Sequence, residues 1–125
     1  MTFSLDRKLW GWGLASYEVP GPLLDLARAF LSARLGRPIG ESRPVPTLDQ
    51  LRMPAPRRSV PVALGDVVTT ERYHRATHTY GKSFRDVVRA LDGDFSPAPD
   101  FVAYPKDESD IERILHVARQ EHLAV

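Results

Sequence analysis

Proline recurs through the middle of the chain too often for a long helix or a central strand. Between residues 37 and 61 it stands at positions 38, 44, 46, 54, 56 and 61. Each proline fixes φ and removes a backbone N–H donor, so this segment can neither continue a helix nor pair inside a sheet. Only Thr47 to Leu51, with Thr47 as cap, leaves room for a short helical turn. The sequence therefore predicts an extended connection whose conformation depends on what it lies against.

Helical spacing of apolar residues appears on both sides of this connection. It predicts a first helix over Pro22 to Leu35 and a second over Phe84 to Leu91, with Ser83 as its N-cap. A third helix is predicted from an Asp107 N-cap to about His122, because acidic residues fill its first turn. The apolar side of the third helix is expected to be Ile111, Ile114, Leu115, Ala118 and His122.

The pattern between the second and third helices is that of a strand. Phe101 to Tyr104 is a short apolar run between Pro99-Asp100 and Pro105, and a further apolar run begins at Leu123. Strand, helix and the start of another strand open a βαβ unit whose closing strand is missing. We expect an α+β chain: a helical, proline-rich region over residues 1–98, then this opening strand and helix over residues 99–125.

Charge and cysteine content exclude several classes of function. The chain has 17 basic and 16 acidic residues, a net charge of +1, and no basic run longer than two residues, as at Arg57-Arg58. A nucleic-acid or anionic-membrane surface needs a one-sided basic field, so we expect neither partner. The chain has no cysteine, so it can form no disulfide or thiolate metal site. No signal peptide or transmembrane segment is predicted, and we expect a cytoplasmic protein. Abundant arginine and absent asparagine suggest a GC-rich bacterial genome.

Two local patterns resemble known binding motifs. Ala76 to Ser83 fits a relaxed phosphate loop, but such a loop follows a buried strand, whereas Thr69 to Arg75 is polar and charged. His74 and His78 are spaced like two metal ligands on a helix, but no third ligand lies near them in sequence. We expect neither a nucleotide site nor a metal site, and we assign no catalytic residue.

Three stretches together resemble a known family of flavoproteins. They are Lys8-Leu9-Trp10-Gly11-Trp12-Gly13, then Arg75-Ala76-Thr77-His78-Thr79-Tyr80-Gly81-Lys82-Ser83, and then Pro99-Asp100-Phe101-Val102-Ala103-Tyr104-Pro105 with the helix after it. In order and spacing they resemble bacterial alkylglycerone-phosphate-synthase-like proteins of the vanillyl-alcohol-oxidase and p-cresol-methylhydroxylase superfamily. The resemblance spans nearly the whole chain.

The resemblance implies that residues 99–125 start an FAD-binding domain. In this family, the strand that follows the helix leads into a glycine-rich turn that holds the FAD pyrophosphate with backbone N–H groups. The sequence stops at Val125, before any such turn, so we expect no cofactor to bind to this chain alone. Tyr104 and Pro105, at the C-terminal end of the strand, are the candidate cofactor-binding residues. A plain strand end followed by a helix-breaking proline explains them equally well.

The expected function is that of the N-terminal part of an FAD-dependent enzyme, inactive alone. The family's reaction exchanges the acyl group of acyl-dihydroxyacetone phosphate for a fatty alcohol, and the cofactor carries the chemistry. One alternative is a fragment of a D-2-hydroxy-acid FAD dehydrogenase, which shares the strand, helix and loop. The other is a small interaction module that pairs with a separately encoded flavin domain. The expected partner is the remainder of the flavoprotein, encoded downstream.

Overall fold

A computed structural model describes residues 7–9 and 12–125 of the chain. The prolines explain its appearance: the helices are short and separate, and long extended segments join them. The elements in chain order are α1 (Gly21–Leu35), the 3-10 turns η1 (Leu48–Gln50) and η2 (Val62–Leu64), β1 (Val68–Thr69), α2 (Arg72–Thr77), α3 (Phe84–Leu91), β2 (Val102–Ala103) and α4 (Glu108–Gln120).

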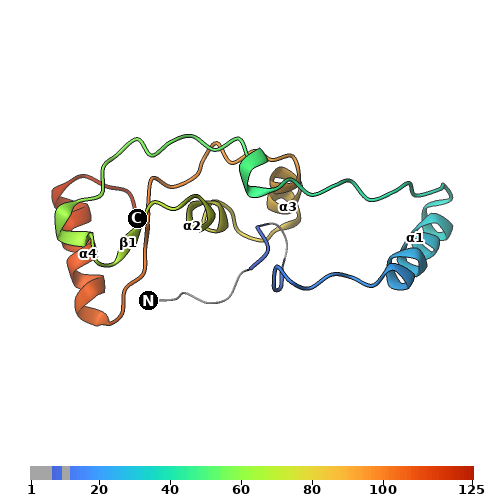
Figure 1. Ribbon diagram of the computed structural model, residues 1–125, viewed down its shortest axis with the longest axis horizontal. Helices are drawn as coiled ribbons and strands as arrows, with labels where there is room; N and C mark the ends of the chain where they lie inside the picture. Colours follow the sequence, from blue (N-terminus) through green and yellow to red (C-terminus); the bar gives the residue numbers. More distant parts are fainter. Residues whose placement is uncertain (1–6, 10–11) are drawn as a thin grey trace.

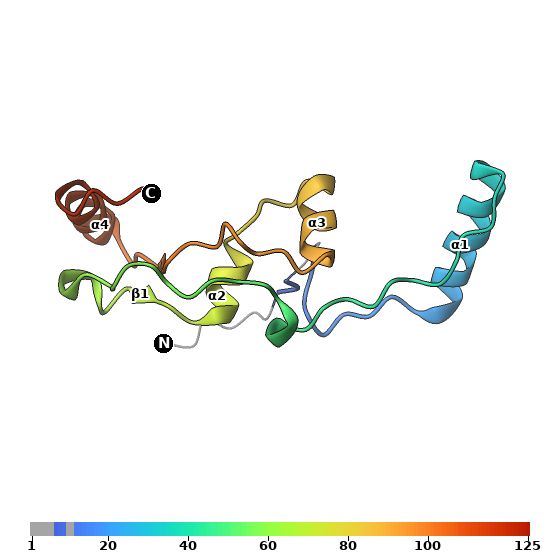
Figure 2. The same cartoon turned by 90° about the horizontal axis from the view of Figure 1, so that it is seen from above.

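The molecule is elongated, with α1 at one end and α4 at the other (Figures 1 and 2). Helices α2 and α3 lie between them, and two extended segments connect α1 to the rest of the chain. No residue of α1 is buried, so this helix contributes nothing to the core of the chain.

Two small apolar clusters hold the rest of the chain together. The first contains Leu51, Ala76, Ala90 and Phe95, and the second contains Leu64, Val67 and Val117. Beside the second cluster, β1 and β2 pair antiparallel, with Val68 opposite Ala103 and Thr69 opposite Val102. Within the described residues, these two short strands form the sheet.

Arginine side chains tie the proline-rich connection to the helices. Arg75 of α2 is 3% exposed and donates from Nε to the Pro99 carbonyl at 2.6 Å and from Nη2 to the Pro54 carbonyl at 2.8 Å. Arg72, one turn earlier, donates to the carbonyls of Leu48 and Leu51. Guanidinium donors thus bond to backbone carbonyls of η1 and of the extended segments.

The three helices predicted from sequence are confirmed, and so are the caps on which the second and third rest. Ser83 accepts from the Asp86 N–H at the start of α3, and Asp107 accepts from the Asp110 N–H at the start of α4. The turn predicted at Thr47 to Leu51 is η1, where the Gln50 side chain accepts from the Thr47 N–H. The α+β class is likewise confirmed at this coarse level.

Two features differ from the sequence analysis. β1 and α2 occupy Val68 to Thr77, where a polar stretch gave no periodic signal. The inner side of α4 agrees with the predicted one only in part: Ala118 is buried and Ile114 packs on the second cluster as expected, but Val117 is buried as well, whereas Ile111 and Leu115 are about half exposed. The reason is a charged contact, because Arg113 on this inner side bonds Asp66 and the Ala63 carbonyl beside η2.

The predicted boundary between residues 98 and 99 stays a prediction. The pairing of β1 with β2 crosses it, as do the contacts of Arg75 and Arg113. None of the helices described is long and apolar enough to cross a membrane.

Candidate functional site

Tyr104 lies where β2 ends and its backbone turns toward α4. Its N–H donates to the Val67 carbonyl at 2.7 Å, which continues the pairing of β2 with β1 by one residue. This bond fixes the direction of the side chain, which points toward α2. Burial raises the pKa of the Tyr104 phenol, and the neighbouring Tyr73 raises it further, so the hydroxyl stays protonated across neutral pH.

Helix α2 brings two histidines to this phenol. His74 Nδ1 lies 2.7 Å from the Tyr104 hydroxyl, and its Nε2 lies 3.6 Å from the carboxylate of Glu71, one turn earlier. The carboxylate favours the tautomer with a proton on Nε2, and in that tautomer Nδ1 accepts a hydrogen bond from the Tyr104 hydroxyl. His74 and His78 also pack edge-on to the Tyr104 ring, at centroid distances of 5.3 and 5.6 Å.

The aromatic cluster of His74, His78 and Tyr104 holds the Tyr104 hydroxyl in a fixed position. Glu71, His74 and Tyr104 form a chain of polar contacts in which the phenol is the end nearest β2. Sequence reasoning noticed the spacing of the two histidines, found no third ligand near them and expected no metal site, but it did not foresee their contact with Tyr104. His78 Nδ1 instead lies 2.8 Å from the His74 carbonyl, and the described residues include no group of three His, Cys, Asp or Glu arranged to hold a metal ion.

Pro105 follows Tyr104 and is exposed. The next N–H, that of Lys106, donates to the buried Asp110 at 2.9 Å, which fixes the turn into α4. The two candidate cofactor-binding residues therefore lie together at the C-terminal end of β2. Their role toward a cofactor remains a prediction.

The segment that resembles a phosphate loop has a different structure. Its first two residues are the last two of α2, so no strand precedes it directly, and it leads through Gly81 and Lys82 to the N-cap Ser83. The Asp86 carboxylate accepts from the Ser83 hydroxyl at 2.9 Å and lies 3.3 Å from the Ser83 nitrogen. A negative side chain thus occupies the place where such a loop would hold a phosphate.

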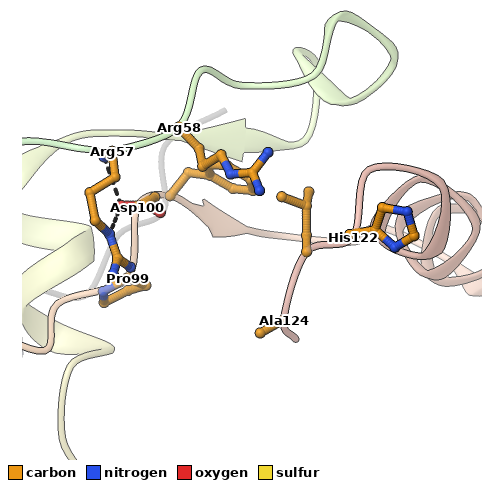
Figure 3. Close-up of a pocket in the computed structure, with 8 residues that line it drawn as sticks. Arg57, Arg58, Pro99, Asp100, His122 and Ala124 are labelled. Carbon is orange, nitrogen blue, oxygen red and sulfur yellow. Dashed lines mark hydrogen bonds and ion pairs between the residues drawn. The ribbon is translucent and has the colours of Figure 1, made fainter.

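A cavity of about 500 Å³ opens at the other end of β2 (Figure 3). Arg57 closes one wall by donating from its backbone N–H and from Nε to Asp100 Oδ1, at 2.8 and 3.1 Å. Arg58 lies between Asp100 and His122 in this view, and it is exposed. Sequence reasoning missed this cavity because only the fold brings Arg57 to Asp100. Its lining residues are Arg57, Arg58, Pro99, Asp100, Phe101, His122, Leu123 and Ala124.

The N-terminal segment that carries part of the resemblance lies partly within the described residues. Trp10 and Gly11 lie outside the described residues, while Trp12 is exposed. Nearby, the Lys8 Nζ lies 5.8 Å from the centre of the Tyr17 ring. The hydroxyl of Tyr73, from α2, donates to the Arg7 carbonyl at 2.9 Å, so this segment reaches the aromatic cluster.

Comparison with known proteins gives one consistent result. The chain is 32% identical over 62 residues to the alkyldihydroxyacetonephosphate synthase of Dictyostelium discoideum, which covers 50% of the chain and 10% of that protein. It is 30% identical over 80 residues to the synthase of Trypanosoma brucei brucei, which covers 64% of the chain and 12% of that protein. No protein-family model matches the chain.

The fold agrees with the sequence matches. Solved structures of alkyldihydroxyacetonephosphate synthase, in P1 and in P212121, align with 94% of the chain at a TM-score of 0.72 and 22% and 21% identity. The chain spans 26% of the length of these structures. The family predicted from the three sequence stretches is thereby confirmed. By sequence and by fold, the chain is related to a limited part of the alkyldihydroxyacetonephosphate synthases, a family of FAD-linked oxidases.

Proposed function

We propose that this chain is the part of an FAD-dependent synthase of the alkyldihydroxyacetonephosphate type in which the flavin domain begins. The observation that carries the proposal is the sequence match to two synthases at 30% identity or more. In this role β2 and α4 are the first strand and helix of the flavin domain. The parent protein would join an alkyl chain to dihydroxyacetone phosphate, the product in the name of its relatives.

The start of α4 does not suit the pyrophosphate part of an FAD molecule. The N-terminus of α4 is the helix start nearest to Tyr104, but Asp107 caps it and Glu108 and Asp110 fill its first turn. Three carboxylates in that place repel a pyrophosphate, although a helix start otherwise favours an anion. The N-terminus of α4 is therefore a poor site for the pyrophosphate, and FAD supplies the redox chemistry when it is bound.

Tyr104 and Pro105 contribute a contact at the strand end. The Tyr104 phenol is oriented by His74, is protonated at neutral pH and lies beside aromatic rings, which suits the edge of a planar ring system. Pro105 adds an exposed apolar surface next to it. The role of this chain is thus to position the cofactor from one side, while the reacting groups lie elsewhere in the parent protein.

An FAD titration tests the proposal. The chain alone should not quench flavin fluorescence in a stoichiometric, micromolar manner, because the remaining contacts are too few to offset the cost of ordering the cofactor. A fusion of this chain to the flavin domain of the Dictyostelium synthase should bind FAD, and Tyr104→Ala should weaken that binding, with Tyr17→Ala as the matched control. Tight FAD binding by the chain alone would contradict the proposal. An FAD affinity of the fusion that is unchanged by Tyr104→Ala would also contradict it.

A further inference from the structure

Helix α1 presents its apolar side away from the chain. Its large apolar side chains are 40% to 66% exposed. At about 100° per residue they span half of the helix circumference, and Ala29 and Ala33 widen the apolar arc to about 240°. These large side chains are Leu23, Leu24, Leu26, Phe30, Leu31 and Leu35.

The polar stripe of α1 faces its own chain instead. Ser32 and Arg28 are half-buried, and the Ser32 hydroxyl donates to the Arg28 carbonyl at 2.8 Å and accepts from the Ile39 N–H at 3.0 Å. Asp25 completes the stripe with an ion pair to Arg28 at 3.2 Å. A surface helix of a globular protein has the opposite arrangement, because its apolar stripe faces the core. Among the described residues, no neighbour buries the apolar side of α1.

We propose that α1 is a docking helix whose apolar arc enters a groove on the body of the flavoprotein, formed by polypeptide outside this chain. The inference rests on the proposed function, because it takes the chain to be part of a larger synthase. The solved synthases support it in one respect. The alignment with the solved synthase leaves out 6% of the 125 residues, which is about 8 residues. Helix α1 has 15 residues, so at least part of it has a counterpart in the synthase, which is about four times longer than this chain.

The width of the arc favours a groove over a second copy of the helix. A helix that packs on one flat neighbour buries a stripe of roughly 100°, which would leave more than half of this arc in water. Two cavities that the described residues form have cationic side chains in their walls, so they suit the apolar arc of a second copy poorly. Arg57 and Arg58 line the cavity at β2, and Arg7 and Lys8 line another of about 690 Å³ beside Tyr17.

Arg34 favours a protein groove over a lipid surface. On the helical wheel it lies near the middle of the apolar arc, between Leu23 and Ala27, and it makes no hydrogen bond or ion pair within the described part of the chain. A guanidinium in that place is costly in a hydrocarbon layer. A protein can instead provide a carboxylate or a carbonyl opposite it. The groove should therefore be apolar, with one acceptor opposite Arg34.

The experiment uses the solved synthase as a full-length protein in which the segment superposed on α1 is exchanged for Gly21–Leu35. Trypsin cleavage after Arg28 is the readout, because a docked helix opens only by local unfolding. We expect cleavage at least about tenfold slower than in the free chain. Phe30→Glu should remove this protection. The control is Arg28→Glu, which places a glutamate on the polar stripe instead of the apolar arc. This change removes the cleavage site at Arg28, so cleavage is followed after Arg34, and the protection there should be unchanged.

Every other outcome counts against the proposal. Cleavage in the exchanged protein as fast as in the free chain would overturn it. A defined dimer of the free chain in sedimentation velocity that Phe30→Glu converts to monomer would also overturn it. Flotation of the free chain with vesicles of phosphatidylcholine and phosphatidylglycerol would do the same. If the exchanged protein does not fold, glutamate at the position of the unmodified synthase that superposes on Phe30 must raise cleavage there. Since β2 and α4 of this chain are absent from the exchanged protein, the FAD titration tests the proposed function separately.

Discussion

Replacing Arg75 by alanine removes the guanidinium that holds two loops against α2. Its two donated bonds go to the carbonyls of Pro54 and Pro99, at 2.8 and 2.6 Å, and the side chain is almost completely buried. Residues 54 and 99 belong to different extended segments, and proline has no N–H with which either could pair along a ladder. Arg75 therefore joins the proline-rich connection to the segment that enters β2.

The expected loss follows from the two bonds. A hydrogen bond from a charged donor contributes about 1.5 to 3 kcal/mol net, and a buried carbonyl left without a donor costs about 1 to 3 kcal/mol. Water entering the gap would return part of this, so we expect Arg75→Ala to lower the free energy of unfolding by about 3 to 5 kcal/mol. Small domains have only about 5 to 15 kcal/mol in total, so the change is large.

Urea unfolding followed by circular dichroism at 222 nm measures this loss. Arg75→Lys keeps the charge but can reach one carbonyl at a time, and it should lose about half as much. Arg58→Ala is the control, because Arg58 is exposed, and it should stay within about 0.5 kcal/mol of the parent chain. A loss below about 1 kcal/mol for Arg75→Ala, with an unchanged denaturant slope, would refute the reasoning.

Three further predictions concern acid stability, a glycine and the loop that resembles a phosphate loop. Hydrogen bonds from Arg57 lower the pKa of Asp100 in the folded chain. The ionised carboxylate therefore stabilises the folded state above the unfolded pKa of about 3.9, and this stabilisation is lost as the pH falls through the lower, folded pKa. In calorimetry, the melting temperature of Asp100→Asn should fall less steeply below pH 5 than that of the parent chain. Gly93 has φ of 69°, so Gly93→Ala should cost about 1 kcal/mol in urea, while Gly40→Ala should be neutral. ATP with magnesium should not raise the melting temperature, and Lys82→Ala should not change that result.

The local parts of the fold could be predicted from the sequence. Helices α1, α3 and α4 were found because caps and turn residues such as Ser83, Asp107 and Gly36 lie next to them in the chain. Their bounds agree with the expected ones within about two residues, which is the usual scatter of helix ends. A sequence signal suffices where the partners of a residue are its own neighbours.

Features that depend on distant contacts could not be predicted. The side of α4 that faces the chain is selected by Arg113, whose partner Asp66 lies 47 residues away. β1 has two residues and exists because Val68 meets Ala103 across the fold. In the candidate site, Tyr104 was chosen from its place at the strand end, but its contact with His74 spans 30 residues and needs α2, which has no periodic pattern.

The arginine contacts suggest why so little apolar core suffices for this part of the chain. Leu64 and Phe95 are the large side chains that are fully buried among the described residues, and the extended segments can pair with few backbone donors. A guanidinium offers several donors at the end of a long stem, so one helical residue can satisfy carbonyls on two segments at once. Arg75 does this for Pro54 and Pro99, and Arg113 does it for Ala63 while it pairs with Asp66. Such contacts fix the positions of segments without much apolar area, and they leave the apolar surface of α1 for a contact outside the chain.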